Sequence, residues 1–316
     1  MLRVALSIAV AVMAVSLGAP VSRADITSLP PEVVAGLAAL GPNLNPDVIA
    51  KTGALMKPLV STERPAGVQV TTDLIYGDDP LQKIDIYKPA KGKNLPIVLF
   101  VHGGGFVGGD KNAYGQFYGN VTAYLASRGI VGVNVDYRLA PKVTWPAASQ
   151  DVGAVVAYMR AHAAAYGGDP KRIIIMGHSA GANIVASYVL DPAVYPKGGP
   201  GVIAAILVSG PAYRAESLSK ADHVYYGEDA SLYAKRVPGA HLKQSKIPLM
   251  IVTTEFDPVS LAPESYDLAA KVCVRDGKCP AFLYIKGHNH ISEMMSIGSK
   301  DDQFARPLVD FIRSVK

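Results

Sequence analysis

Residues 171–181 read KRIIIMGHSAG, and this stretch decides the fold class. Its first part is a short, continuous apolar run, which is typical of a strand buried on both faces of a parallel sheet. The segment ANIVASYVL at 182–190 has the spacing of apolar residues that predicts a helix. A buried strand that turns through GHSAG directly into a helix is one unit of an α/β fold.

The same alternation of strand and helix recurs through most of the chain. Alternating patterns on either side of a GDDP turn predict an antiparallel hairpin at 71–77 and 82–90. Apolar runs then predict buried strands at 95–102, 130–137, 172–177, 202–210, 248–257 and 281–287. Helical spacing occurs at 121–129, 148–167, 182–190, 264–274 and 304–315. The sequence therefore predicts an α/β fold with a mostly parallel sheet and helices on both faces.

The length and composition are those of one folded domain with two additions. The chain has 316 residues, of which 49% are hydrophobic, and we expect a single domain over residues 25–316. Residues 25–70 have helical periodicity in pieces, which predicts an N-terminal helical segment packed over the main domain. Residues 213–245 form an unusually long connection between two strands, where we expect a small helical lid, with residues 25–70 as a candidate second part of it. Three of its tyrosines are candidates for contacts with a substrate or for ordinary packing: Tyr225, Tyr226 and Tyr233.

The first 24 residues have the pattern of a secretory signal peptide. Arg3 makes a short basic start, residues 4–18 are an apolar run, and small residues occupy the −3 and −1 positions of a cleavage site after Ala24. The alternative is an uncleaved anchor, but the run is shorter than the roughly 20 apolar residues that cross a bilayer. We therefore expect an exported protein, periplasmic or secreted, with no stable membrane span once residues 1–24 are removed.

The net charge and the two cysteines indicate which partners and which covalent or metal sites to expect. The formal net charge is +5 and the basic residues are scattered, so we expect no nucleic-acid partner. Cys273 and Cys279 lie close together in CVRDGKC, and in an oxidising compartment we expect them to form a disulfide. A zinc site is disfavoured because no second pair of ligands lies near them in the sequence.

Ser179 is the candidate nucleophile. It is the central residue of GHSAG, and a G-x-S-x-G motif between a strand and a helix holds its serine in a tight, strained turn. Gly177 and Gly181 leave room for close packing, and the helix that begins near Ala180 directs its free N–H groups toward the serine. A small-residue turn without chemistry is the alternative interpretation of the motif taken alone.

A serine hydroxyl needs a base, and the base needs an acid that orients it. Asp257 follows PLMIVTTEF and His290 follows AFLYIKGHN, so both lie at the carboxyl ends of predicted strands, where open α/β sheets place their sites. Glu255 is the alternative acid, although it lies at its strand end rather than on the turn beyond. His288 is the alternative base. A metal site in GHNH is disfavoured because no other ligand lies near it in the sequence.

The segment VHGGGFVGGDK at 101–111 is the candidate oxyanion loop. Consecutive glycines allow backbone N–H groups to face a ligand without side chains in the way, and an oxyanion needs donors aimed at it. We expect the N–H groups of Gly104, Gly105 and Ala180 to be these donors, and His102 to hold the loop by hydrogen bonding. A phosphate-binding P-loop is disfavoured because no G-K-[ST] follows the glycines.

Together these motifs resemble those of a known family. HGGG, DYRLAP at 136–141, WPAASQD at 145–151 and GHSAG, with an aspartate and then a histidine at later strand ends, resemble the α/β-hydrolase esterases of the hormone-sensitive lipase-like group. The lid segment and GHNHIS look more like the neighbouring bacterial feruloyl/acetyl esterase and arylformamidase-like branch. The resemblance covers roughly residues 73–316, and VPGAH in the lid departs from it.

The resemblance adds expectations about individual residues. It implies an α/β-hydrolase fold in which Ser179, Asp257 and His290 follow one another in the order of the family's triad. It favours His290 over His288, because His290 precedes an apolar residue as in that branch. It also implies that the DYR residues at 136–138 shape the loop near the site rather than react.

The function expected from these features is that of a serine carboxylic-ester hydrolase. The resemblance implies short-chain acyl or aromatic esters as small-molecule substrates, an acyl-enzyme intermediate on Ser179, and no metal or organic cofactor. An arylformamidase-like amidase that uses the same residues is the alternative, and a non-catalytic ligand-binding member of the fold is a more remote one. The oligomeric state is left open.

Overall fold

The computed structural model describes residues 27–61, 63–113, 117–196 and 198–316. The signal peptide expected at residues 1–24 therefore lies outside the described residues. Within the described part of the chain, no helix is both long enough and apolar enough to cross a membrane.

An eight-stranded sheet forms the centre of the molecule, in the order β1-β2-β4-β3-β5-β6-β7-β8. Its strands are β1 (Val68–Ile75), β2 (Lys83–Pro89), β3 (Leu95–Val101), β4 (Val131–Val135), β5 (Gly168–His178), β6 (Ala204–Val208), β7 (Leu249–Phe256) and β8 (Ala281–Asn289). β1 and β2 form the predicted antiparallel hairpin, β2 also pairs antiparallel with β4, and every pairing from β4 to β8 is parallel. The mostly parallel sheet predicted from the apolar runs is confirmed.

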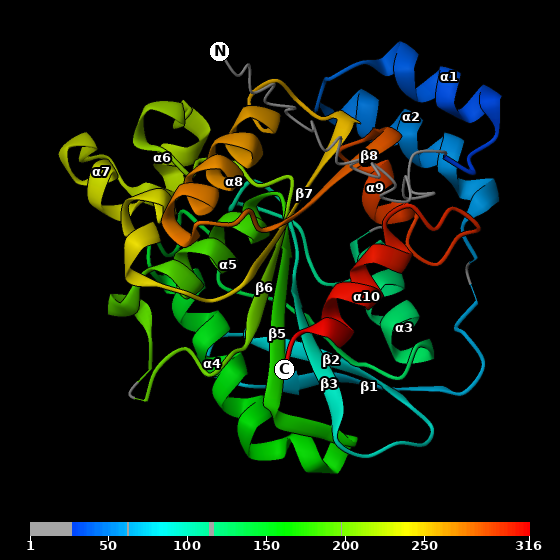
Figure 1. Cartoon of the computed structure of the whole chain (residues 1–316), viewed down its shortest axis with the longest axis horizontal. Helices are drawn as coiled ribbons and strands as arrows, with labels where there is room; N and C mark the ends of the chain where they lie inside the picture. The colour runs from blue at the N-terminus through cyan, green and yellow to red at the C-terminus, as the bar shows by residue number, and fades with distance from the viewer. Residues whose placement is uncertain (1–26, 62, 114–116, 197) are drawn as a thin grey trace, which may run out of the picture.

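Helices cover both faces of this sheet (Figure 1). One face carries α3 (Gly119–Ser127) and α10 (Ala305–Ser314), and the other carries α4 (Ala147–His162), α5 (Ala180–Leu190) and α8 (Ala262–Asp276). Since the sheet is covered on both sides, its central strands have no polar face.

β5 shows why the sequence of such a strand is an unbroken apolar run. Ile173 and Ile175 pack into the core under α4 and α5, whereas Ile174 and Met176 pack into the core under α3 and α10. Successive side chains of a strand point to opposite faces, so burial on both sides requires every position to be apolar. All four side chains are fully buried, and each such burial stabilises the fold by about 1.5–3 kcal/mol.

Two N-terminal helices, α1 (Pro31–Leu40) and α2 (Pro46–Met56), form a separate small layer. Each begins with a proline in its first turn, where the missing N–H costs nothing, and Asn45 caps α2 by accepting a hydrogen bond from the N–H of Val48 at 3.0 Å. Their apolar side chains pack together with Phe256, the last residue of β7, and with Met295, the last residue of α9 (Ser292–Met295), the short helix that follows β8. This layer therefore lies over the edge of the sheet where the candidate site residues were expected.

Residues 213–245 fold into short helices, among them α6 (Lys220–Tyr226) and α7 (Tyr233–Arg236). Their tyrosines are packing residues. The ring of Tyr225 stacks on Phe106 at 4.4 Å between centroids, and the Tyr226 hydroxyl donates to Asn183 Oδ1 at 2.9 Å. Tyr225, Tyr226 and Tyr233 belong to the core under α4 and α5.

Cys273 and Cys279 form a disulfide, as the sequence predicted. The bridge joins the last turn of α8 to the residues that lead into β8. It therefore closes the connection between these two elements.

Candidate active site

The turn at Ser179 is as tight as its sequence predicted. β5 ends at His178, α5 begins at Ala180, and Ser179 between them has φ 56° and ψ −128°. Glycine is required on both sides: a Cβ at Gly177 would lie 2.2 Å from the carbonyl oxygen of Gly181, and a Cβ at Gly181 would lie 2.2 Å from that of Val101. A positive φ at serine costs about 1–3 kcal/mol, and such strain is typical of functional turns.

His290 and Asp257 are brought together by the register of two neighbouring strands. β7 and β8 pair in parallel with Phe256 opposite Asn289, so the next residue of each strand, Asp257 and His290, emerges at the same point. His290 Nδ1 lies 2.8 Å from Asp257 Oδ1. The other carboxylate oxygen accepts a hydrogen bond from Thr253 Oγ1 at 3.0 Å. The carboxylate is thus held in place by two contacts, an arrangement that suits an acid that orients an imidazole and stabilises its charged form.

Ser179 and His290 line one cavity of about 470 Å³. Since Nδ1 of His290 faces Asp257, its other ring nitrogen, Nε2, is free for the cavity side, and this buried atom has no hydrogen-bond partner among the described residues. Gly104 and Gly105 line the same cavity. The structure therefore gathers the candidate nucleophile, base and oxyanion loop around a single space, with Asp257 behind the base.

Apolar side chains supply much of the remaining lining. They come from Leu44 and Ile49 of the N-terminal layer, from Ala113 and Phe117, and from Ile291 beside the base. Asp110 is the acidic residue that lines the cavity. None of the residues that line this cavity within the described part of the chain comes from 213–245, so the N-terminal layer covers the site.

The two rival residues in the sequence have other partners. Glu255 is exposed, and its Oε2 accepts a hydrogen bond from the N–H of Gly287 at 2.8 Å. His288 is fully buried, with Nε2 2.8 Å from Asp301 Oδ2 and Nδ1 3.0 Å from Ser292 Oγ. Ser292, His288 and Asp301 have the residue types of a triad, but all three are buried and none lines the cavity. They hold the segment after β8 in place.

The oxyanion loop owes its shape to glycines and to His102. Gly104 has φ 128° and Gly105 has φ 60°, and a Cβ at Gly104 would lie 2.0 Å from the carbonyl oxygen of Gly108. His102 Nδ1 lies 2.6 Å from the carbonyl oxygen of Gly103, so this nitrogen donates to it. Because the C=O of Gly103 and the N–H of Gly104 belong to one trans peptide plane, this hydrogen bond turns the N–H of Gly104 away from His102.

Ala180 provides the third candidate donor. It is the first residue of α5, where the backbone N–H has no acceptor within the helix. The positive end of the helix dipole adds to the stabilisation of a negative oxygen next to Ser179.

A buried lysine anchors the end of the oxyanion loop. Lys111 Nζ lies 2.8 Å from Asp73, 3.4 Å from Asp136 and 3.5 Å from Asp85. Burial alone would lower the pKa of Lys111, but the hydrogen bond to Asp73 and the charges of the other two carboxylates outweigh it and raise the pKa above its ordinary value. The lysine therefore remains charged and keeps the loop attached to the hairpin and to β4.

The DYR motif has the supporting place that the resemblance implied. Asp136 Oδ1 accepts a hydrogen bond from the backbone N–H of Lys111 at 2.6 Å, and the Tyr137 hydroxyl donates to the carbonyl oxygen of His102 at 3.0 Å. Arg138 pairs with Asp151 of α4 at 2.7 Å. These side chains hold both ends of the oxyanion loop and do not line the cavity.

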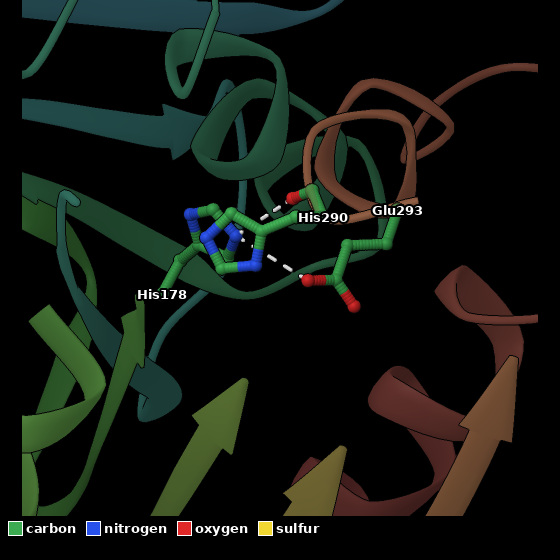
Figure 2. Close-up of side chains that lie close together, drawn as sticks. All are labelled: His178, His290 and Glu293. Atoms are coloured by element: carbon green, nitrogen blue, oxygen red, sulfur yellow. Dashed lines mark hydrogen bonds and ion pairs between the residues drawn. The ribbon is translucent and has the colours of Figure 1, made fainter. Parts of the chain in front are cut away.

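Two further residues at the site, His178 and Glu293, were not singled out in the sequence. Figure 2 shows the carbonyl oxygen of His290 and the carboxyl group of Glu293 on the same side of the His178 imidazole, with His178 Nε2 2.9 Å from the former and 3.3 Å from the latter. His178 Nδ1 lies 2.9 Å from the hydroxyl of Tyr118. The only sequence signal was position: His178 is the variable residue of GHSAG, and Glu293 follows the base within one helical turn.

The pKa values of both groups are shifted toward the neutral form. Burial is the main cause that lowers the pKa of His178 well below its ordinary value, and the nearby His290 lowers this pKa further. Burial is the main cause that raises the pKa of Glu293 well above its ordinary value, and the charge of Asp257 raises this pKa further. A pair of charges at this position would lack water, so burial favours the neutral form of each group.

His178, His290 and Glu293 are also the residues whose spacing suits a metal ion, since one donor atom of each lies within 4.8 Å of the others. The hydrogen bonds argue against such a use. His178 Nε2 faces a carbonyl oxygen, so it carries a hydrogen and has no lone pair for a metal. The residues present therefore do not fit a resident metal ion.

The neutral carboxyl of Glu293 predicts a pH-dependent stability. The folded chain keeps a proton on Glu293 at pH values where the unfolded chain has lost it, because the folded pKa is the higher one. The free energy of unfolding therefore falls as pH rises from the ordinary carboxyl pKa of about 4.3 toward the folded value, by up to about 1.4 kcal/mol per pH unit. Glu293→Gln replaces the titrating carboxyl with an amide that does not titrate. The Tm of this variant minus the Tm of wild type should therefore increase from pH 5 to pH 8.

The measurement is a thermal melt of both proteins at each pH. Glu255→Gln is the control, because Glu255 is exposed and its variant should follow wild type at every pH. A Tm difference between Glu293→Gln and wild type that stays constant from pH 5 to pH 8 would show that Glu293 is ionised in the folded protein.

Known proteins similar to this chain are esterases. Residues 84–190 match the family described as BD-FAE, a segment that includes the oxyanion loop and GHSAG. The isoprenylcysteine alpha-carbonyl methylesterase of Arabidopsis thaliana is 38% identical over 126 residues, which are 40% of this chain and 29% of that protein. Carboxylesterase NlhH of Mycobacterium tuberculosis is 30% identical over 69% of this chain and 64% of its own length. The match thus spans less than a third of the plant relative.

Solved structures extend the similarity over nearly the whole fold. The crystal structure of esterase B from Lactobacillus rhamnosis superposes with a TM-score of 0.69 at 20% identity, covering 90% of this chain and 95% of that one. A hyperthermophilic esterase from Pyrobaculum calidifontis superposes with a TM-score of 0.61 at 21% identity, covering 90% and 97%. These superpositions show that the chain has the α/β-hydrolase fold, and its sequence is similar to those of esterases.

Proposed function

We propose that this protein is a carboxylic-ester hydrolase that uses Ser179 as nucleophile, His290 as base and Asp257 as the acid that orients the base. The observation that carries the proposal is the position of His290. Its Nδ1 is paired with Asp257 at 2.8 Å, its Nε2 has no hydrogen-bond partner among the described residues, and His290 lines the same cavity as Ser179. The similarity to esterases supports the same reaction class.

The first half of the reaction forms an acyl-enzyme. Ser179 Oγ attacks the ester carbonyl carbon while His290 Nε2 takes the hydroxyl proton, and the new imidazolium is stabilised by Asp257. Negative charge moves onto the carbonyl oxygen, which the N–H groups of Gly104, Gly105 and Ala180 receive. His290 then gives its proton to the leaving alcohol, and the acyl group remains on Ser179.

The second half releases the acid. Water enters the space that the alcohol has left, His290 Nε2 takes one of its protons, and the resulting hydroxide attacks the acyl carbon. The same N–H donors hold the second oxyanion, and the proton returns from His290 to Ser179 Oγ as the carboxylic acid departs. Every proton moves through a single imidazole, and no other group has to supply or remove one.

The cavity supports small esters as substrates. Its volume of about 470 Å³ lies in the lower half of the range of roughly 300–1,000 Å³ found for small-molecule sites. Leu44, Ile49, Phe117 and Ile291 offer apolar surface to a short acyl chain or an aromatic group, and Asp110 disfavours a substrate with a negative charge. We therefore propose short-chain acyl or aromatic esters as the substrate class.

The proposed location is outside the cytoplasm. The pattern of residues 1–24 supports export, and a disulfide between Cys273 and Cys279 fits an oxidising compartment.

A substrate panel tests the proposed function. The purified protein is incubated with p-nitrophenyl esters from C2 to C16, with methyl ferulate and with N-formylkynurenine. We expect fast release from the short esters and a steep decline as the acyl chain lengthens. Turnover of the formyl amide alone would make the protein an amidase. No turnover by the folded protein would point to a ligand-binding member of the fold.

A further inference from the structure

A chain of hydrogen bonds connects the oxyanion loop with the loop that carries the base. The backbone N–H of Gly103 donates to the Tyr118 hydroxyl at 3.3 Å. That hydroxyl lies 2.9 Å from His178 Nδ1, and His178 Nε2 lies 2.9 Å from the carbonyl oxygen of His290. Four residues far apart in the sequence are thus joined through one phenol and one imidazole, both of which line the cavity.

The direction of each hydrogen bond follows from its end groups. The carbonyl oxygen of His290 can only accept, so His178 Nε2 carries the hydrogen. A carboxyl oxygen of Glu293 lies 3.3 Å from the same nitrogen, but it makes no hydrogen bond to it. Since burial keeps the imidazole neutral, Nδ1 has a lone pair and accepts from the Tyr118 hydroxyl. The phenolic oxygen in turn accepts from the N–H of Gly103, so all donors point from the oxyanion loop toward the base loop.

Tyr118 occupies its position at a cost to the backbone. It has φ 76°, immediately before the first residue of α3, and a left-handed conformation is unfavourable for a tyrosine. Its ring packs against Phe100 at 5.3 Å between centroids. There is also no spare room beside it: a Cβ at Gly103 would lie 2.8 Å from the Tyr118 hydroxyl and 2.9 Å from Ser179 Cβ. The Tyr118 hydroxyl is therefore tightly packed against Gly103, the residue that precedes the candidate oxyanion donors.

Each end of this chain of hydrogen bonds fixes a backbone peptide next to a group that reacts. Gly103 is held on both sides, by Tyr118 at its N–H and by His102 at its carbonyl oxygen, and the N–H of Gly104 belongs to the same peptide plane as that carbonyl. At the other end, His178 holds the carbonyl oxygen of His290 itself. Misplacing reacting groups by about 1 Å can cost about 100-fold in rate.

We propose that Tyr118 and His178 are positioning residues that set the oxyanion donors and the catalytic base relative to each other through this directed chain of hydrogen bonds. The kinetic part of the proposal rests on the proposed ester hydrolysis, and the part about hydrogen-bond direction does not. Tyr118→Phe removes the hydroxyl and keeps the ring, so the packing against Phe100 remains while Gly103 and His178 lose their common partner.

The first experiment compares Tyr118→Phe with Tyr124→Phe, a control in the helix that follows Tyr118, where the Tyr124 ring packs under Arg128. We expect kcat for a short ester to fall about 10- to 100-fold in Tyr118→Phe, with KM changed less than about threefold, while Tyr124→Phe behaves as wild type. Inhibition by a trifluoromethyl ketone, which mimics the tetrahedral oxyanion, should weaken by the same factor as kcat/KM. A variant that loses Tm but keeps kcat and inhibitor affinity would overturn the positioning role.

The second experiment observes the hydrogen bonds of His178 directly and does not depend on ester hydrolysis. The protein is labelled with ¹⁵N-histidine, and His178→Gln assigns the His178 signals. We expect a neutral imidazole with hydrogen on Nε2 from pH 5 to pH 8, and a shift of the Nδ1 resonance in Tyr118→Phe as its hydrogen bond is lost. An imidazolium, or hydrogen on Nδ1, would overturn the proposed direction. If wild type hydrolysed no ester, the function would fail while this measurement still decided the hydrogen-bond chain.

Discussion

Ser179→Ala is expected to lower kcat/KM for a short p-nitrophenyl ester by about 10⁴-fold or more while the protein stays folded. The reason is that alanine keeps the turn but has no nucleophile. Ser179 is partly exposed, and alanine meets the same positive φ as serine, so the change should leave Tm close to that of wild type. The measurement is steady-state hydrolysis beside a thermal melt of the same preparation.

Ser292→Ala is the matched control for this variant. Ser292 is the other serine that lies beside a histidine and an aspartate, but it is fully buried, and its hydroxyl is hydrogen-bonded to His288 and to the N–H of Asn289. We expect it to lower Tm and to leave kcat within a few-fold of wild type. Residual activity of Ser179→Ala above about a thousandth of wild type would count against Ser179 as nucleophile.

His290→Ala is the second variant for which a very large effect is expected. Without the imidazole, nothing takes the proton of Ser179 or returns it to the leaving alcohol, so kcat should fall by about 10⁴-fold or more. The loss should be nearly the same as in Ser179→Ala, and the double variant should be no worse than either, because the two residues act as one unit. Single-turnover and steady-state assays of the three proteins test this non-additivity.

His288→Ala should behave in the opposite way. This side chain is buried between Asp301 and Ser292, and its removal leaves the carboxylate of Asp301 without its 2.8 Å partner. Breaking a buried pair of this kind costs about 3–5 kcal/mol, so Tm should drop sharply while the folded fraction keeps its kcat. If His288→Ala instead lost catalysis and His290→Ala kept it, the base would be His288.

The hydrogen bonds around these two histidines show what a sequence pattern can and cannot resolve. They lie at the end of the same strand, His288 within β8 and His290 directly after it, and both have an aspartate partner at 2.8 Å, Asp301 for His288 and Asp257 for His290. The residue types in GHNH are compatible with either assignment. Their difference lies in the surroundings, since His290 lines the cavity of Ser179 and His288 is enclosed by the segment after β8.

The segment that covers the site is a second feature that the sequence pattern did not resolve. Residues 213–245 were the expected lid because the connection is long, and they form short helices whose tyrosines pack into the core under α4 and α5. Leu44 and Ile49, from the helical segment expected to pack over the domain, line the cavity. Length and periodicity indicated that both segments were extra layers, but they carry no information on which surface each layer covers.

The sequence alone determined the alternation of strands and helices, the mostly parallel sheet and the turn that presents Ser179. These are local properties: burial on two faces requires an unbroken apolar strand, and the carbonyl oxygen of Gly181, four residues further on, leaves no room for a side chain at Gly177. Only the tertiary structure decided which polar side chains meet. The pairing of Phe256 with Asn289 places Asp257 beside His290, and packing of α3 against the sheet brings Tyr118 to His178. Such contacts join residues far apart in the chain, where no local pattern acts.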